Sequence, residues 1–357
     1  MSDPSTPPTT PAIHWDDDAR RLSFERWLAG VAATHGLRPT TLCAASSDAS
    51  FRRYFRVDGV LASCIVMDAP PTHEDVRPFV HVAELILAAG LNAPRIVEQD
   101  AAQGFLLLSD LGTRLYLTEL QAAVAAGDTV GVQRLMRDAI TTLVTWQQRV
   151  DASTLPPYDD ALLRRELALF PDWCVEREFG QRWSDAQRTQ WQATTDLLVA
   201  SALAQTRVAV HRDYMPRNLM VGAPGRPGIL DFQDAVRGPI SYDVASLLRD
   251  AFVSWDEEQE IDWAVRYWEQ ARKLSLPVPD DFGDFWRQLE WMGLQRHLKV
   301  LGIFCRLKHR DGKAKYSEDL PRFFSYAHRV ATRYSGLGPL ARLLEPLMGE
   351  QRSDVYF

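Results

Sequence analysis

The chain has 357 residues, of which 24 % are charged, 46 % hydrophobic and 10 % aromatic. This is the composition of a folded globular protein with a large core, and it excludes a disordered, collagen-like or coiled-coil chain. The 40 basic residues are outnumbered by 47 acidic ones, and the resulting net charge of -7 argues against a broad nucleic-acid surface.

The amino-terminal segment bears on where the protein resides. Residues 1–17 are rich in proline and threonine, which predicts a disordered tail. They carry acidic residues where a signal peptide needs positive charge, which argues against a signal peptide. The apolar stretches are shorter than the roughly 20 residues of a membrane-spanning helix. We therefore expect a cytoplasmic protein with neither a membrane nor a nucleic-acid partner, and we assume a monomer. The four cysteines form no CxxC pair, so we expect reduced thiols.

The next stretch, residues 18–111, predicts a small lobe built on an antiparallel sheet. An apolar stripe of 3.6-residue period predicts a helix from about 18 to 34, and short β-like runs follow between residues 40 and 69. Thr72 and Asp75 have the spacing of a capping box at the start of a helix that crosses the sheet. The runs RIVEQD and GFLLLSDL predict two further strands around a turn.

From Gly112 onward the pattern is that of a larger, mainly helical lobe, residues 112–357. Long amphipathic helices are predicted at about 128–149, 159–179, 184–204, 242–253, 256–273, 280–309 and 317–332. A β-rich island interrupts them at 208–232, where two short strands flank a Gly/Pro turn. The predicted fold class is therefore α+β. Two lobes also suit the length, because single cores stop growing at roughly 250 to 300 residues.

The island carries a spaced set of polar residues that is typical of phosphoryl transfer. His211, Asp213 and Asn218 follow the H-x-D-x-x-x-x-N pattern of a kinase catalytic loop, and Asp231 ends the next strand. Only two asparagines occur in the chain, so composition produces this pattern by accident roughly once in 250 such sequences. A single Asp or Asn in a loop is usually a turn residue, but the set together favours a catalytic site.

Phosphoryl transfer requires such residues because the protein must mainly position the reactants and neutralise charge. Asp213 is expected to orient the acceptor hydroxyl and accept its proton, and His211 to hold the loop. Asn218 and Asp231 supply hard oxygen ligands for Mg²⁺. Asp234, three residues further on, is assigned to the substrate site, with a second metal or a bracing role as alternatives.

Longer segments around these residues resemble the aminoglycoside-phosphotransferase and choline-kinase superfamily. The resemblance covers roughly residues 40–330 and includes HRDYMPRNLM and GPISYDVASLLRDAF. It implies a bilobal protein-kinase-like fold, with a small antiparallel-sheet lobe, one crossing helix and a larger helical lobe, that uses ATP to phosphorylate a small molecule. Asp243, at the start of a helix in the second segment, matches the family's Asp that is expected to brace the catalytic loop.

Other segments narrow the resemblance. SDASFRRYFRV, MDAPP and QRHLKVLGIFCRLKHRDGKAKY are very similar to bacterial N-acetylmuramate/N-acetylglucosamine anomeric kinases. This implies phosphorylation of the first-carbon hydroxyl of these amino sugars by Mg·ATP in peptidoglycan recycling. Two alternatives stay open. One is another acceptor, such as an amino alcohol, an aminoglycoside or a tRNA-modification metabolite, and the other is a nucleotide sensor without turnover.

The small lobe departs from the kinase pattern because it has no lysine. All five lysines lie beyond residue 272, and Met67 stands where strand three of a kinase carries one. Arg52, Arg53 and Arg56 are candidates for clamping phosphate oxygens instead. Strand alternation prevents all three from reaching ATP, and a solvated hairpin is the alternative.

The segment LLLSDLGTRL is expected to connect the lobes. The main-chain groups of Ser109, Asp110 and Leu111 are candidates for contacts with adenine. The Asp110 carboxylate is a candidate either for ribose or for a turn cap. Gly112 is expected to let the chain turn.

The acceptor site is predicted on two helices. Glu166, Phe170 and Trp173 share one helical face and combine a carboxylate with two aromatics, as sugar sites often do. The second helix carries three basic residues at near-helical spacing that are candidates for the lactyl carboxylate of muramate: Arg296, Lys299 and Arg306. The alternatives are core packing of the aromatics and a solvated basic stripe.

Overall fold

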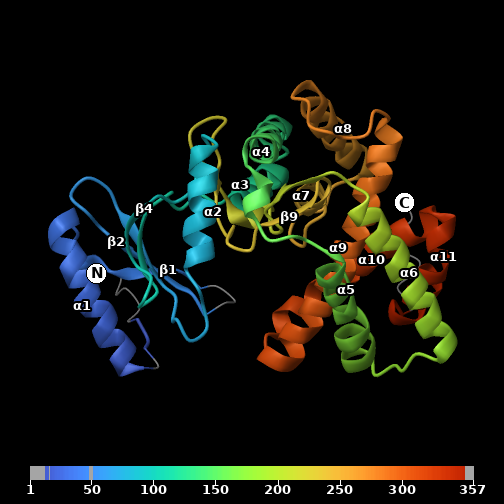
Figure 1. The fold of residues 1–357 in the computed structure, drawn as a ribbon, viewed down its shortest axis with the longest axis horizontal. Coiled ribbons are helices and arrows are strands. Elements are labelled where there is room, and N and C mark those ends of the chain that lie inside the picture. The colour runs from blue at the N-terminus through green and yellow to red at the C-terminus, as the bar shows by residue number, and fades with distance from the viewer. Residues whose placement is uncertain (1–12, 16, 48–50, 350–357) are drawn as a thin grey trace, which may run out of the picture. The chain divides into compact units, whose positions relative to one another are not determined.

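The structure is a computed structural model that describes residues 13–15, 17–47 and 51–349. They form two compact units, and Figure 1 shows the elements of each. The first unit is the chain up to Arg114 together with a returning segment, Gly228–Asp234, and the second is Leu115–Pro227 and the chain from Ala235 onward. Most of the predicted tail lies outside the described residues, as does the part of the predicted phosphate loop at 48–50.

The first unit is a five-stranded antiparallel sheet with a helix on each side, as predicted. Its strands pair in the order β1-β2-β3-β5-β4, and all four pairings are antiparallel. Figure 1 shows the two helices on opposite sides of the sheet. The elements are α1 (Asp18–His35), β1 (Cys43–Ser47), β2 (Arg53–Val57), β3 (Cys64–Asp68), α2 (Arg77–Ala88), β4 (Ile96–Asp100) and β5 (Phe105–Ser109).

Both faces of the central strands are buried, which explains their continuous apolar runs. On one face, Phe55 of β2 and Phe105 of β5 pack against Phe24 and Leu28 of α1. Trp15, inside the predicted tail, stacks on the Phe55 ring at 5.9 Å between centroids. The alternate residues of each strand point to the other face, where α2 lies.

Helix α2 begins later than its sequence suggests. It starts at Arg77, with Val76 as the capping position and no side-chain cap. The Asp75 carboxylate accepts a hydrogen bond from the Arg77 N–H at 3.0 Å, and a proline occupies the first turn. The predicted capping box at Thr72 is therefore wrong, because an Asx turn and a proline at the first turn start the helix instead.

The second unit is mainly helical. Its only described strand pair of four residues each is β6 (Arg207–Val210) with β9 (Val236–Pro239). The two-residue strand β7 (Leu219–Met220) also lies here, and β8 (Gly228–Ile229) belongs to the first unit. The helices are α3 (Tyr116–Ala125), α4 (Thr129–Arg149), α5 (Asp160–Leu169), α6 (Asp185–Leu203), α7 (Tyr242–Leu248), α8 (Glu257–Lys273), α9 (Phe282–Asp311), α10 (Leu320–Arg333) and α11 (Gly338–Leu344). Within the described residues no helix is long and apolar enough to cross a membrane.

Two predicted helices differ from the structure for local reasons. The one expected at 159–179 continues α5 as a π-helix, Phe170–Glu178, where Gly302 of α9 lies so close to Leu169 that a Cβ would come within 2.4 Å of its backbone. The one expected at 242–253 ends at Leu248, because the Asp250 side chain accepts hydrogen bonds from two N–H groups that follow it. Helices α3 and α11 are not predicted.

Candidate active site

The loop between β6 and β7 holds the residues predicted for catalysis. His211 and Asp213 follow β6 directly, and a 3₁₀ turn over Pro216–Asn218 leads into β7. The Asp213 carbonyl accepts a hydrogen bond from the Met215 N–H at 3.0 Å and another from the Asn218 side-chain amide at 2.9 Å. The structure thus brings the predicted base and one predicted metal ligand together in one closed loop.

Asp243, the first acidic residue of α7, holds this loop by its main chain. Its carboxylate accepts hydrogen bonds from the N–H groups of His211 at 2.7 Å and Arg212 at 3.0 Å. Burial raises the pKa of Asp243 to about 7, although both of these hydrogen bonds favour the ionised form. Asp243 thereby fixes the residue pair that precedes Asp213.

The His211 ring supports the loop from within. Its Nδ1 accepts a hydrogen bond from the Asp213 N–H at 3.2 Å, and its edge meets the Tyr214 ring at 5.7 Å. The side chain is 2 % exposed, so it is enclosed by protein. The bracing contacts predicted for His211 and Asp243 are therefore present in the fold, while their effect on turnover stays a prediction.

Arg212 has a left-handed backbone, with φ at 77°. This conformation is strained for a residue other than glycine and persists only where the surroundings hold it. Two neighbours do so, because Asp243 binds the Arg212 N–H and Glu166 of α5 accepts a hydrogen bond from its guanidinium. Burial alone would lower the pKa of Arg212, but the Glu166 charge raises it, so the guanidinium is charged.

Glu166 is the centre of a buried polar cluster. One carboxylate oxygen is bound by Arg212 and by Lys299 Nζ at 3.1 Å, and the other by the Tyr158 hydroxyl and by Gln295 Nε2 at 3.3 Å. A carboxylate has about four lone-pair positions, so this one has no position left for a sugar hydroxyl. The predicted substrate role of Glu166 is corrected accordingly, and the residue is a partner of Arg212.

The charges of this cluster explain its ionisation. Burial alone would raise the pKa of Glu166, but Lys299 and Arg212 lower it to about 2. Burial alone would lower the pKa of Lys299, but Tyr242 and Glu166 raise it. Lys299 also donates a hydrogen bond to the Tyr242 hydroxyl at 3.1 Å. The cluster is therefore an ion triad with one carboxylate and two cations.

Asp231, the other predicted metal ligand, belongs to the segment Gly228–Asp234 of the first unit. Its φ is 60°, a second left-handed position without glycine, and its Oδ1 accepts a hydrogen bond from Gln233 Nε2 at 2.9 Å. The next ring, Phe232, is fully buried and packs against Phe79 of α2 at 4.7 Å between centroids. This packing anchors the segment to the first unit.

Asp110 follows β5 and caps the turn after it. Its carboxylate accepts hydrogen bonds from Arg56 Nε at 2.6 Å, from Ser63 Oγ at 2.7 Å and from the Gly112 N–H at 2.8 Å. Burial would raise the pKa of Asp110, but these bonds hold it below its usual range. Of its two predicted roles, the turn cap is the one seen here, and Gly112 supplies the positive φ of 94°.

The residues on either side of Asp110 differ in their main-chain hydrogen bonding. The Ser109 N–H donates to the Arg95 carbonyl at 2.9 Å, and the Ser109 hydroxyl accepts from the Arg95 N–H at 2.9 Å. Leu111 makes no main-chain hydrogen bond to any residue that the structure describes. The Ser109 N–H therefore already has a partner, and the contact of the Leu111 main chain with adenine stays a prediction.

The predicted phosphate arginines have protein partners. Arg53 binds the buried Asp68 carboxylate through Nε at 3.0 Å and stacks on Trp15 at 3.9 Å from the ring centre. Arg56 binds Asp110. Arg52 lies 3.8 Å from Glu74 of the segment before α2. Contacts of Arg52 and Arg53 with a nucleotide stay predictions, and Arg52 has the weaker ion pair.

The π-helix changes how the predicted acceptor residues Glu166, Phe170 and Trp173 are arranged. Phe170 is fully buried and packs against Trp191 and Phe324, so it belongs to the core. Because the helix widens into a π-helix after Leu169, the spacing from Glu166 to Trp173 no longer defines one face. Trp173 is half-buried.

Two further predicted substrate residues lie apart in the chain. Arg306 of α9 has a buried Nε without a hydrogen-bond partner, and burial lowers its pKa. Asp234 is exposed at the end of the returning segment. Substrate contacts of Trp173, Arg306 and Asp234 stay predictions.

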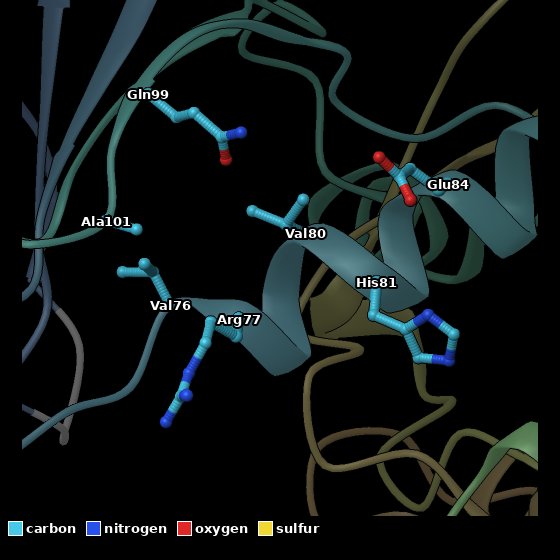
Figure 2. A pocket seen from close by; sticks show the side chains of 7 residues that line it. All are labelled: Val76, Arg77, Val80, His81, Glu84, Gln99 and Ala101. Carbon is cyan, nitrogen blue, oxygen red and sulfur yellow. The ribbon is translucent and has the colours of Figure 1, made fainter.

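An open hollow on the first unit lies between α2 and the end of β4 (Figure 2). It is lined by Val76, Arg77, Val80, His81, Glu84, Gln99 and Ala101. Figure 2 shows Val76 and Val80 on the α2 side and Gln99 across from them. None of the predicted site residues lines this hollow.

Sequence reasoning missed several residues that shape the site. Tyr158 and Gln295 bind Glu166 but belong to no motif, and no spacing pattern connects them to the loop. Arg217 stands at an unspecified position of the H-x-D-x-x-x-x-N pattern, so the pattern gives it no role.

A comparison with protein families agrees with this fold and loop. The family model described as "Phosphotransferase enzyme family" matches residues 41–283. The chain belongs to this family.

Curated proteins include close relatives. The chain is 50 % identical over 313 residues to the N-acetylmuramate/N-acetylglucosamine kinase of Pseudomonas putida, covering 88 % of this chain and 90 % of that protein. It is 46 % identical over 341 residues to the protein of the same name from Neisseria meningitidis serogroup B, covering 95 % and 99 %.

Solved structures share the fold. Plasmodium vivax ethanolamine kinase has a TM-score of 0.58 at 11 % identity, covering 87 % of this chain and 89 % of that one. The streptomycin-ATP-APH(2'')-IIa ternary complex has a TM-score of 0.56 at 15 % identity, covering 87 % and 97 %. At such identities these structures establish the fold alone, and the predicted protein-kinase-like fold is confirmed.

Proposed function

We propose that the chain transfers the γ-phosphoryl group of ATP to the C1 hydroxyl of N-acetylmuramate and N-acetylglucosamine, forming the sugar 1-phosphates in peptidoglycan recycling. The observation that carries this proposal is the closed H-x-D-x-x-x-x-N loop, braced by Asp243 and Glu166. It occurs in a chain that is about half identical to two kinases of that name.

Asp213 orients the acceptor. Its carboxylate accepts the proton of the C1 hydroxyl while the sugar oxygen forms its bond to phosphorus and the bond to ADP breaks. An anomeric hydroxyl is more acidic than an ordinary alcohol, so a carboxylate that mainly positions it is sufficient. The hydrogen bonds to the Asp213 carbonyl and N–H keep this residue in place.

Asn218 and Asp231 are the proposed ligands of a magnesium ion that is held mainly by phosphate oxygens. Mg²⁺ commonly takes one or two protein carboxylates together with substrate phosphates. Asp231 supplies a carboxylate. Asn218 supplies an amide oxygen, because its nitrogen donates to Asp213. The ion would neutralise phosphate charge.

Nucleotide and sugar contacts complete the proposal. The main chain of Leu111 is the proposed adenine contact, and Arg52 is the proposed phosphate contact of the first unit. Trp173 and Arg306 are proposed for the sugar. The carboxylate of muramate would suit the incompletely bonded guanidinium of Arg306.

The proposal is tested by ADP release from Mg·ATP with N-acetylmuramate, N-acetylglucosamine, glucose, choline, kanamycin or no acceptor. Phosphorus NMR identifies any product. A sugar 1-phosphate signal with the two N-acetyl sugars is expected. Turnover with choline or kanamycin in place of the sugars would overturn the acceptor assignment, and ATP binding without any turnover would indicate a sensor.

Asp213→Asn tests the base directly. We expect kcat to fall by at least about 100-fold, in line with general-base effects, while binding of Mg·ATP is largely retained. Asp185→Asn is the matched control, because that side chain is 98 % exposed on α6. Near-normal turnover by Asp213→Asn would remove Asp213 from the reaction.

A further inference from the structure

The catalytic loop holds a second arginine whose surroundings are the opposite of those of Arg212. Arg217 lies in the 3₁₀ turn, four residues after Asp213 and directly before Asn218. Arg212 is paired with Glu166. Arg217 makes no hydrogen bond and no ion pair with any residue in the described ranges. One loop therefore carries one arginine that is paired with a carboxylate and one that is not.

The contact that Arg217 does make leaves its donors free. The guanidinium carbon lies 5.2 Å from the centre of the Phe252 ring, and the side chain is only partly exposed. A cation–π contact uses the charge of the guanidinium and none of its five N–H donors. Phe252 thus orients Arg217 without using its hydrogen-bonding capacity, as suits a residue that awaits an anion.

Phosphoryl transfer needs such a cation here. Negative charge spreads over the three equatorial oxygens of the group in flight. No lysine precedes Lys273, so the first unit has none to offer. Two of its predicted phosphate arginines, Arg53 and Arg56, are bound by carboxylates. Arg217 carries the uncommitted positive charge closest in sequence to both Asp213 and Asn218.

We propose that Arg217 is a catalytic residue that donates N–H hydrogen bonds to the equatorial oxygens of the phosphoryl group during its transfer. The inference rests on the proposed function, and it adds a role to the same site. Arg217 exchanges no proton in the step. The acceptor proton goes to Asp213, the new bond joins the acceptor oxygen to phosphorus, and ADP departs. Arg217 stabilises the charge that this exchange spreads over the group.

The experiment compares wild type with Arg217→Ala and Arg217→Lys on both amino sugars. We expect Arg217→Ala to lose about 100-fold in kcat, the size measured for removal of one oxyanion donor, with KM values for ATP and sugar within a few-fold of wild type. The loss should be equal for N-acetylmuramate and N-acetylglucosamine, because the phosphoryl group is common to both. Added guanidinium ion should restore part of the activity of Arg217→Ala, which it would not do for a folding defect.

Arg217→Lys keeps the charge and loses the planar fork, so we expect an intermediate kcat. The matched control is Arg342→Ala, since Arg342 is exposed on α11, and it should equal wild type. An increase in KM confined to N-acetylmuramate would overturn the inference and assign Arg217 to the acceptor carboxylate. An unchanged kcat would overturn it as well.

A second measurement separates this inference from the sugar assignment. Slow hydrolysis of Mg·ATP by water, without any acceptor, also requires the phosphoryl group to leave ADP. Arg217→Ala should lower this rate by a factor similar to that seen with sugar. If wild type phosphorylates neither sugar, the proposed function fails, but the hydrolysis rate still decides whether Arg217 acts on the phosphoryl group.

Discussion

Two buried carboxylates, one in each unit, are each bound by two cations, yet they serve different parts of the molecule. Asp68 is fully buried at the end of β3, and Glu166 is 5 % exposed on α5. Their cations are Arg20 and Arg53 for Asp68, and Arg212 and Lys299 for Glu166. The two arrangements of charge are alike. They differ in the structural elements that carry the cations.

The Asp68 triad joins a helix to a sheet. Arg20 comes from α1 and Arg53 from β2, and Arg20 also lies over the Phe105 ring at 4.0 Å. The Glu166 triad instead includes Arg212, whose strained backbone directly precedes Asp213. The comparison teaches that the same kind of ion triad joins a helix to a sheet in the first unit and, in the second, holds the residue that precedes Asp213, the predicted base.

The largest expected effect follows from breaking the first triad. Asp68→Ala leaves Arg20 and Arg53 without their carboxylate, and removal of one partner of a buried ion network typically costs about 3 to 5 kcal/mol. We expect the free energy of unfolding in urea to fall by about that amount. Below the unfolding transition, kcat should stay within twofold of wild type.

A helix-matched control sharpens this prediction. Arg21 of α1 pairs with exposed partners on its own helix, and exposed pairs contribute at most about 1 kcal/mol, so Arg21→Gln should be nearly neutral. A fall in kcat for Asp68→Ala with unchanged unfolding would contradict the comparison, because it would place Asp68 in the site.

Acid titration separates Glu166 from Asp243, the other carboxylate that holds the loop. The pKa of Asp243 is raised to about 7 by burial, whereas that of an unfolded Asp is about 3.9. A raised pKa means that the folded chain binds the proton more tightly. The stability contribution of Asp243 is therefore highest below about pH 4 and falls by about 1 kcal/mol per pH unit up to about pH 7.

The measurement is urea unfolding of wild type and Asp243→Asn at pH 5, 6 and 7. Asparagine does not titrate, so the difference in unfolding free energy between the two proteins should change by about 1 kcal/mol per pH unit. Any hydrogen bond that the substitution weakens adds a cost that does not depend on pH. Parallel pH profiles would show that Asp243 is already ionised at pH 5. Glu166, with a pKa of about 2, contributes no slope in this range.

The strands of the first unit and the π-helix of the second differ in how well the sequence predicts them. Strands β3 and β5 are short runs in which both faces are apolar, and this pattern together with the turns between them indicates a buried sheet. The π-helix at Phe170–Glu178 has the apolar spacing of an ordinary helix. Where the helix widens, Gly302 lies against Leu169. Gly302 is distant in the chain, and hydrophobic periodicity does not report such a contact.

The sequence predicts the part of the candidate site in which the spacing of residues along the chain indicates the chemistry. The H-x-D-x-x-x-x-N pattern located the loop of Asp213 and Asn218, because that chemistry depends on residues near in sequence. Glu166 was assigned to the sugar because a helical face shows which side chains point together, but not what lies opposite them. The cations that saturate it are known only once α9 is placed beside α5.

Breaking the second triad with a conservative substitution should lower the free energy of unfolding less than Asp68→Ala does, and it should also lower kcat. Glu166→Gln keeps the shape of the side chain but turns one acceptor oxygen into a donor, which faces a cation or the Tyr158 hydroxyl. Arg212 loses its partner, and Asp213, its neighbour, shifts. Misplacement by about 1 Å can cost on the order of 10²-fold. We expect a loss of that order in kcat, with little change in the KM for ATP.

Glu290→Gln is the control that isolates position from charge. Glu290 is fully buried in the same unit and is likewise bound by two cations and a tyrosine, Arg249, Arg333 and Tyr334, but none of these adjoins the catalytic loop. Both variants should lose stability, whereas only Glu166→Gln should lose kcat. Equal loss of kcat in the two would mean that a weakened fold explains both. A fall in kcat limited to Glu166→Gln ties the left-handed Arg212 to the placement of Asp213, since that pair is the feature that distinguishes the two clusters.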